Sequence, residues 1–397
     1  MAGPMDGVRV VELGVWVAAP AAGGILADWG ADVVKIEPPT GDPGRTFARM
    51  LGVQGDLNPP FEMDNRSKRG VVLDLTTDAD RAVARDLLRD ADVFVTNVRP
   101  GALQRLGLDY ATVAADNPGL VYGLITGYGE TGPDADRAAF DVAAFWARAG
   151  VADLLTRPGD TPPFQRGGMG DHSAAMTLVA AIGAALFARA RTGVGQLVTT
   201  SLYRQGAYTV SFDLNTFLLT GHPIAVGQRE SMGNPCMNNY AAGDGRRFWI
   251  VGLQAARHWP ALCRAVDRPD WLTDPRYASP ADRARNAATL IAELDAIFAT
   301  KPLDDWAVVF AGEDDFFWSP INTLEDVLAD GQFHAAGGVV YVPDGETTVP
   351  MVATPADFHG TPCAPRSRAP QLGEHTEQVL AELRAQRAAR ANPDFTD

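Results

Sequence analysis

The alternation of apolar runs with helical patterns in the first 130 residues constrains the fold most strongly. Each run is apolar nearly throughout, and helical patterns such as residues 78–91 separate the runs. The runs cover residues 8–13, 32–37, 71–75, 92–98 and 119–127. Strands of this kind are buried on both faces, as in a parallel sheet that helices cover on both sides. The sequence therefore predicts an α/β fold.

The apolar patterns and the residue composition change along the rest of the chain. Residues 172–191 form the longest apolar helical pattern, and a strand pattern over 196–203 and a helix over 203–220 follow. Trp, Pro and Asp become frequent between about 222 and 330, and two strand-like runs and an amphipathic helix pattern follow later. We therefore expect a large domain over 1–221, a small domain over 222–334, and a C-terminal segment, 335–397, that returns to the large domain.

Composition excludes several classes of protein. The 49 acidic and 34 basic residues give a net charge of -15, which argues against binding to nucleic acid. The sequence predicts no membrane span and no signal peptide, since no apolar run approaches about 20 residues and the N-terminus lacks the signal pattern. The odd number of cysteines and the spacing of the histidines predict neither a disulfide framework nor a metal site. The expected location is cytoplasmic. The cysteines are Cys236, Cys263 and Cys363.

Ligands of open α/β sheets bind beyond the carboxyl ends of the strands, so these positions are the first candidates for a site. Small residues over 14–24 follow the first predicted strand, where they either approach a ligand closely or pack a helix on the sheet. No G-x-G-x-x-G fingerprint is present. Cations flank two other strands and either hold phosphates or form a solvated surface: Arg66, Lys68, Arg69, Arg99 and Arg105.

Asp171 lies between a glycine-rich turn and the long helical pattern. The local sequence favours a helix N-cap, because Asp accepts a backbone N–H at that position. The alternative is a carboxylate that the helix N-terminus keeps ionised near neutral pH, which could act as a nucleophile toward an acyl group. No G-x-S-x-G elbow and no P-loop offer a competing site.

Seven stretches together resemble the family III CoA-transferases, which include formyl-CoA transferase, carnitine CoA-transferase and alpha-methylacyl-CoA racemase. They occur in the order of the family and run nearly end to end. The stretches cover residues 26–45, 65–75, 97–108, 127–133, 170–196, 234–252 and 370–383. The resemblance implies a Rossmann-like large domain, a smaller α+β domain, and an interlocked homodimer.

The resemblance also implies a reaction and its residues. Asp171 falls on the family's nucleophile, which would take CoA from an acyl-CoA to a free carboxylic acid through an aspartyl anhydride and an aspartyl-CoA thioester. CoA is then a substrate, and no tightly bound cofactor and no metal are expected. The expected CoA contacts are Val17, Ala18, Asn65, Lys68, Asn97, Val98, Arg99, Arg105, Arg137 and Phe140. Pro38 aligns with an adenine-side arginine of formyl-CoA transferase, so that contact is replaced or absent here. Val17 aligns with an active-site glutamine of that enzyme, which argues against an oxalate-like substrate.

Two alternatives remain open at this point. The first is a racemase or isomerase acting at the alpha carbon, although Phe140 and Ala255 occupy the positions of its histidine and glutamate, so two proton-transfer groups are missing. The second is a CoA-binding paralogue without catalysis, in which Asp171 only caps its helix. The aromatic side chains of Phe140, Phe145 and Trp146 either line an acyl pocket or belong to the core. The residues identify neither donor nor acceptor, and gating by a glycine loop around Gly227 and Gly233 stays open.

Overall fold

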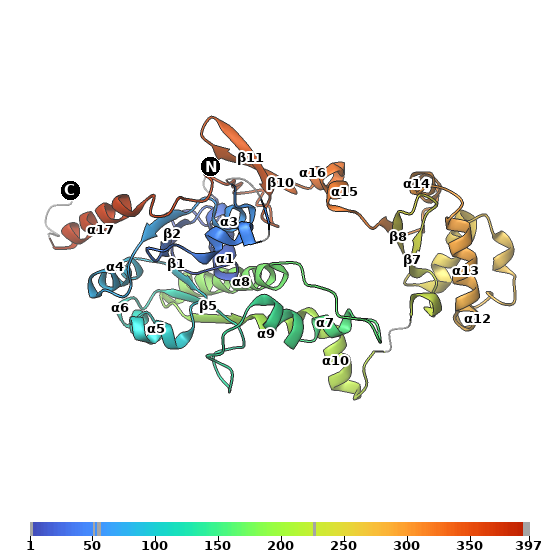
Figure 1. The fold of residues 1–397 in the computed structure, drawn as a ribbon, viewed down its shortest axis with the longest axis horizontal. Coiled ribbons are helices and arrows are strands. Elements are labelled where there is room, and N and C mark those ends of the chain that lie inside the picture. The colour runs from blue at the N-terminus through green and yellow to red at the C-terminus, as the bar shows by residue number, and fades with distance from the viewer. Residues whose placement is uncertain (1–2, 51, 54–56, 225–227, 392–397) are drawn as a thin grey trace. The chain divides into compact units, whose positions relative to one another are not determined.

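The computed structural model describes residues 3–50, 52–53, 57–224 and 228–391. The chain forms two compact units (Figure 1). Residues 1–215 and 335–397 make up the first unit, and residues 216–334 make up the second. The domain boundary predicted at 222 lies a few residues beyond the division at 216.

A six-stranded parallel sheet forms the centre of the first unit. Its order is β3-β2-β1-β4-β5-β6, the order of doubly wound dinucleotide-binding folds. This confirms the predicted α/β class with a parallel sheet, although β3 begins two residues before its apolar run. The strands are β1 (Arg9–Leu13), β2 (Asp32–Glu37), β3 (Arg69–Val72), β4 (Val93–Thr96), β5 (Val121–Thr126) and β6 (Leu197–Ser201).

The apolar runs fill two separate cores because neighbouring residues of a strand point to opposite faces. Val10, Val33 and Val93 pack with α1 (Ala18–Asp28) and α8 (Met169–Thr192) on one face. Their neighbours Val11, Val34 and Phe94 pack on the other face, with four helices. These helices are α4 (Asp78–Arg89), α5 (Pro100–Leu106), α6 (Tyr110–Asp116) and α17 (Thr376–Ala391).

Short elements complete the first unit. The helix predicted over 203–220 is divided into α9 and α10, and α5 ends at Gly107, which has a φ of 67° and separates α5 from α6. The elements are η1 (Pro43–Thr46), α2 (Phe47–Met50), α3 (Pro59–Asn65), η2 (Val142–Arg148), α7 (Val151–Leu154), α9 (Leu202–Thr209) and the strands β10 (Val339–Asp344) and β11 (Thr347–Val352). Helix α10 (Ser211–Thr220) crosses the division between the two units, which lies between residues 215 and 216.

The C-terminal segment is tied to the N-terminal part of the first unit. Arg368 donates to Glu62 Oε1 at 2.6 Å, and the Arg366 backbone N–H donates to Ser67 Oγ at 2.8 Å. Val379 of α17 is buried in the core beneath β3. Residues about 300 positions apart in the chain therefore belong to one folded body.

The second unit has an antiparallel sheet, β7-β8-β9, and its own aromatic core around Trp271, Phe298 and Phe310. Its strands are β7 (Met237–Ala241), β8 (Arg247–Val251) and β9 (Trp318–Pro320). Its helices are η3 (Arg229–Ser231), α11 (Ala255–Ala265), η4 (Pro269–Leu272), α12 (Pro280–Arg285), α13 (Ala287–Phe298), α14 (Leu303–Ala311), α15 (Leu324–Ala329) and α16 (Gly331–Ala335), the last of which ends at the border of the unit.

The expectation that no apolar segment reaches the length of a membrane span is wrong for α8. This helix has 24 residues, and an 18-residue window within it has a mean hydropathy of 1.6, so by length and composition it could cross a bilayer. A helix packed in a protein core has the same composition. Leu178, Val179 and Ile182 of α8 are buried against the sheet, which explains its apolar character.

Candidate active site

The loops that follow β1 and β4 meet where the strand order reverses, which is the ligand-binding position of an open α/β sheet. Asn97 joins the two loops by accepting from the Val15 backbone N–H at 3.0 Å and donating to the Val15 carbonyl at 2.8 Å. The next residue, Trp16, has a φ of 66°, and its backbone N–H donates to Asp42 Oδ1 at 3.0 Å. Two side chains therefore hold a strained backbone just before α1.

The turn before α8 places Asp171 in the first turn of the helix. Gly168 is the N-cap, with a φ of 79°, so the helix begins at Met169 and Asp171 is its third residue. The alternative interpretation from the local sequence, in which Asp171 is the helix N-cap, is therefore wrong. The glycine-rich turn supplies the cap through a left-handed backbone that residues with a Cβ rarely adopt.

Asp141 is an acidic partner of this turn. Its Oδ2 accepts the Gly170 backbone N–H at 3.0 Å, and its Oδ1 is buried with no hydrogen-bond partner in the described part of the chain. A Cβ on Gly170 would lie 2.2 Å from Asp141 Oδ1 and 2.3 Å from Phe145 Cγ, so only glycine fits at this position. Because Asp141 accepts its N–H, Gly170 offers no free backbone donor to a ligand.

The charge state of Asp171 differs from the one expected. Burial and, to a smaller extent, the carboxylate of Asp141 raise its pKa to about 7, against the lowering effect of His172. The helix N-terminus favours the ionised form, but desolvation and the second carboxylate outweigh it. Near neutral pH the group is therefore divided between its acid and its carboxylate form.

A histidine and a buried carboxyl group lie next to Asp171. His172 Nε2 and Asp64 Oδ1 are 3.0 Å apart, and the hydrogen bond to Asp64 raises the pKa of His172. Asp64 belongs to α3 and is 4% exposed. The pair brings an ionisable group of α3 to the first turn of α8.

Two of the predicted CoA contacts, Asn65 and Lys68, are buried with their polar atoms paired. Lys68 Nζ donates to the Pro20 carbonyl at 2.8 Å and to Asn65 Oδ1 at 2.9 Å, and it forms an ion pair with Glu12 at 2.7 Å. Burial lowers the pKa of Lys68 to about 8. Their contact with CoA stays a prediction, and in this conformation neither side chain offers a polar atom to a ligand.

The neighbouring cations Arg66 and Arg69 also form structural ion pairs. Arg66 is buried and binds Asp28 through Nε and Nη2, and Arg69 binds Asp32 and Glu382. Neither of the two interpretations of the segment 65–70, a phosphate site or a solvated surface, describes the buried Arg66 and Lys68.

The remaining predicted CoA contacts lie at the carboxyl edge of the sheet. Arg99, Arg105 and Arg137 are exposed, and Arg99 Nη1 lies 3.5 Å from the Asp136 carbonyl, which brings the loop after β4 to the loop after β5. Val17 is the N-cap of α1, Ala18 is its first residue, and Val98 is half-buried beside Asn97. These positions surround the point where the strand order reverses.

The aromatic residues divide into two groups. Phe145 and Trp146 are buried in the core, so they do not line an open pocket. Phe140 is 62% exposed and meets Trp16 edge to face at 5.8 Å, and Trp16 meets Phe47 in the same way at 5.9 Å. Since Phe140 precedes Asp141, this aromatic group adjoins the turn that carries Asp171.

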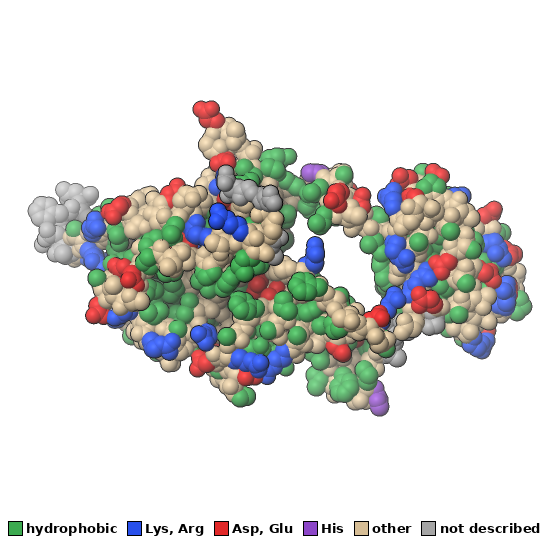
Figure 2. Space-filling view, viewed as in Figure 1, with side chains coloured by type: hydrophobic (Ala, Val, Ile, Leu, Met, Phe, Trp, Pro, Cys, Tyr) green, Lys and Arg blue, Asp and Glu red, His purple; other side chains and the backbone are tan. Residues whose placement is uncertain are grey.

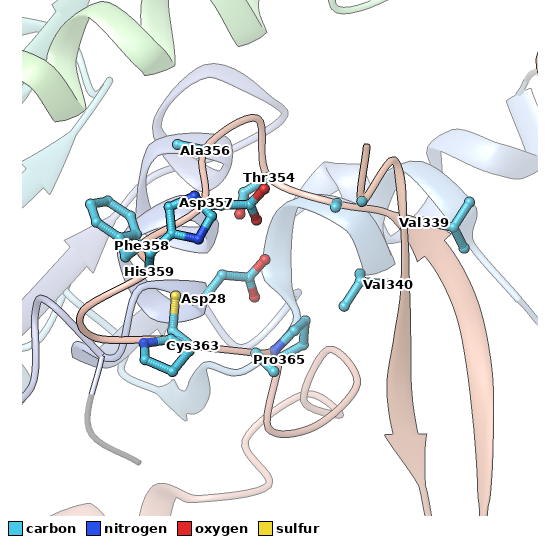
Figure 3. Close-up of a pocket in the computed structure, with 14 residues that line it drawn as sticks. Asp28, Val339, Val340, Thr354, Ala356, Asp357, Phe358, His359, Cys363 and Pro365 are labelled. Atoms are coloured by element: carbon cyan, nitrogen blue, oxygen red, sulfur yellow. The ribbon is translucent and has the colours of Figure 1, made fainter. Parts of the chain in front are cut away.

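A cavity of about 410 Å³ lies at the other end of α1 (Figure 3). Asp28, the last residue of α1, lines it together with Cys363 and apolar side chains such as Val340. Because α1 begins at the carboxyl edge of the sheet, this cavity lies at the opposite edge. It is therefore separate from the group around Asp171.

Several expectations concern residues outside this group. Gly227 of the proposed glycine loop lies outside the described residues. Ala255 begins α11 of the second unit, so its position relative to Phe140 stays open. The described residues contain no cluster of three or more potential metal ligands, and all three cysteines are free.

Sequence reasoning missed three residues of this site: Asp64, Asp141 and His172. A signal was present for Asp141, because it directly follows Phe140, which occupies the position of the racemase histidine. Asp64 gave no signal, since it is 107 positions before Asp171 and only the packing of α3 against α1 brings it near.

The chain is similar to known proteins along nearly its whole length. Residues 5–376 match the model of CoA-transferase family III. The chain is 34% identical to (R)-2-hydroxy-4-methylpentanoate CoA-transferase of Clostridioides difficile, over 96% of this chain and 95% of that protein. It is 33% identical to cinnamoyl-CoA:phenyllactate CoA-transferase of Clostridium sporogenes, over 95% and 93%. A solved CAIB/BAIF family protein from Brucella suis superimposes with a TM-score of 0.82 at 33% identity, and the match covers 96% of this chain and 100% of that one.

Proposed function

The chain belongs to CoA-transferase family III and is a CoA-transferase, and from this premise we propose that Asp171 is its nucleophile. The observation that carries the proposal is the position of Asp171 in the first turn of α8, beside two further ionisable side chains. A carboxyl group whose pKa is near 7 is partly ionised at neutral pH, so part of the enzyme population carries a carboxylate that can act as a nucleophile. A capping role would not need this arrangement, since Gly168 already caps the helix.

The proposed reaction has two exchanges at the Asp171 carboxyl. A carboxylate oxygen attacks the thioester carbonyl of the acyl-CoA, and the C–S bond breaks. The CoA thiolate departs, and an aspartyl anhydride remains on the enzyme. The thiolate then attacks the aspartyl carbonyl and releases the donor acid, which leaves an aspartyl-CoA thioester. The acceptor carboxylate repeats the two steps in reverse order and takes the CoA. The energy of the thioester is kept throughout.

Coenzyme A is proposed to bind across the carboxyl edge of the sheet. The exposed guanidinium groups of Arg99, Arg105 and Arg137 are suited to its phosphates, because they offer charge and several donors each. Val17 and Ala18 at the start of α1 and Val98 after β4 leave room for the backbone to approach the pantetheine. Asn97 also holds the backbone of Val15 through two hydrogen bonds, so it positions the loop after β1 for CoA binding.

The acyl group is proposed to be branched or aromatic. Trp16, Phe47 and Phe140 offer an apolar surface next to Asp141. The two curated relatives named above carry 4-methylpentanoate, cinnamoyl and phenyllactate in their names. Acceptors with such side chains are therefore the first to test, beside acetate and succinate.

The experiment that tests the proposal is CoA exchange between acyl-CoA donors and a panel of free acids, with trapping at Asp171. Incubation with acyl-CoA followed by hydroxylamine should modify Asp171, as seen by peptide mass spectrometry, and Asp171→Asn should lose exchange by at least about a thousandfold. An active enzyme with unmodified Asp171 would contradict the proposal. Deuterium entering the alpha carbon without an acceptor acid would instead favour an isomerase.

The functional form is proposed to be a cytoplasmic homodimer. Apolar side chains gather on the surface of α10 (Figure 2). The exposed ones are Phe212, Leu214, Phe217, Leu218 and Leu219. Exposed apolar patches of this kind mark interaction surfaces. The free cysteines fit a reducing compartment.

A further inference from the structure

The residue after Asp171 is a histidine that the reaction above does not use. His172 Nε2 lies 3.0 Å from Asp64 Oδ1, the Asp64 side chain is 4% exposed, and the His172 side chain is 40% exposed. One edge of the imidazole ring is therefore fixed in the interior. The ring lies in the same helical turn as Asp171.

Close packing holds both members of the pair in place. A Cβ on Gly168 would lie 3.0 Å from His172 Cε1 and 3.1 Å from His172 Nδ1, so the ring packs directly over the capping glycine. On the other side, a Cβ on Gly24 would lie 2.6 Å from the Asp64 carbonyl oxygen, which shows how closely α3 lies against α1. The position of the ring relative to the first turn of α8 is therefore set by backbone packing on two sides.

The charges around the ring come from three elements. Asp64 of α3, Asp171 of α8 itself and Asp141 before η2 all favour the protonated imidazole. Burial raises the pKa of Asp64, and Glu12 adds to this effect, whereas the hydrogen bond to His172 and the charge of Lys68 favour the Asp64 carboxylate. A positive charge in the first turn of a helix opposes the helix dipole, so it requires compensation of this kind.

Resting on the assignment of Asp171 as nucleophile, we propose that His172 is a positioning residue whose imidazolium Asp64 holds beside that nucleophile. The positive charge offsets the repulsion between Asp171 and Asp141 and lets Asp171 lose its proton before it attacks the thioester. Asp64 keeps the ring protonated and oriented through Nε2–H. The three residues act as one unit, although only Asp171 touches the acyl group.

The test is the pH dependence of CoA exchange in His172→Gln. Glutamine keeps an N–H donor for Asp64 and removes the positive charge. The pH at which kcat reaches half its maximum on the acidic side of the profile, called the acid-side midpoint, should therefore rise by about one pH unit. At pH near 7, kcat should fall about fivefold, and it should recover at about pH 9, with the KM for the acyl-CoA unchanged. His359→Gln is the matched control, because His359 is exposed and lies at the separate cavity, and its profile should match the parent enzyme.

Two results would overturn the inference. One is an unchanged midpoint in His172→Gln, and the other is an equal loss of kcat at every pH, which a purely structural role would give. In the unaltered enzyme, an NMR titration of the His172 ring should give a pKa above the usual value of about 6.5, and a lower value contradicts the pairing. If Asp171→Asn stays active, the proposed function itself fails, whereas an inactive Asp171→Asn with an unshifted His172→Gln removes only the role of His172.

Discussion

At the scale of single residues, Asp171 shows how two local effects on one carboxyl group compete. Its place in the first turn of α8 favours the carboxylate, and this part can be predicted from the sequence. Burial and the approach of Asp141 favour the acid, and together they raise the pKa to about 7. Those two effects depend on the packing of η2 against α8, which no local pattern encodes.

The raised pKa predicts how stability depends on pH. The folded state holds the Asp171 proton more tightly than the unfolded chain, whose carboxyl has the usual value of 3.8. The stability linked to this proton is therefore full below about pH 4 and is lost as the pH rises through about 7. Asp171→Asn cannot ionise and should be more stable than the parent at about pH 8, by about 2 kcal/mol after allowance for partial exposure.

Urea unfolding at about pH 4.5 and pH 8 measures this effect, and the advantage of Asp171→Asn should shrink at the lower pH. An advantage of equal size at both pH values would contradict the raised pKa. The same variant should lack exchange in the activity assay, so a gain in stability together with a loss of activity is the expected pattern of a strained functional site.

At the scale of elements, α8 carries two glycines with opposite requirements. A methyl group on Gly170 would meet Asp141 and Phe145, so Gly170→Ala should destabilise the protein by about 2–3 kcal/mol and reduce exchange. Gly183 lies in the same helix, and a Cβ added there would have nothing within 4 Å, so Gly183→Ala should stabilise the protein by about 0.5–1 kcal/mol. Thermal unfolding of both variants measures the contrast. Equal effects of the two changes would show that Gly170 is not held by close packing.

The elements themselves were largely predictable. Residues 32–37 form β2 as expected. An apolar run this short can bury both of its faces as an inner strand of a parallel sheet that helices cover on both sides. Helix ends were less predictable. The long helix begins at Met169, not after Asp171, since a left-handed Gly168 starts it, and Val210 ends α9 within a pattern that reads as one helix.

At the scale of the whole molecule, the apolar surface of α10 predicts self-association. Light scattering should give twice the chain mass, because exposed leucines such as Leu218 and Leu219 gain about 1.5–3 kcal/mol each when buried. Leu218→Glu with Leu219→Glu should shift the mass toward a single chain, since a charge would have to be buried. Arg384→Ala, an exposed change on α17, is the control and should not shift it. A single-chain mass for the unaltered protein would contradict the homodimer.

Local patterns and an ordered set of motifs were enough to predict the parallel α/β sheet, the strand ends that gather the candidate site, and Asp171 as the candidate nucleophile. The surroundings of Asp171 depend on how the chain packs. This packing buried Lys68 in an ion pair with Glu12, left Arg99, Arg105 and Arg137 exposed, and brought Asp64 and Asp141 to the first turn of α8. The charge state and the exposure of these side chains depend on neighbours that are distant in the chain, and the packing of α1, α3 and α8 places those neighbours.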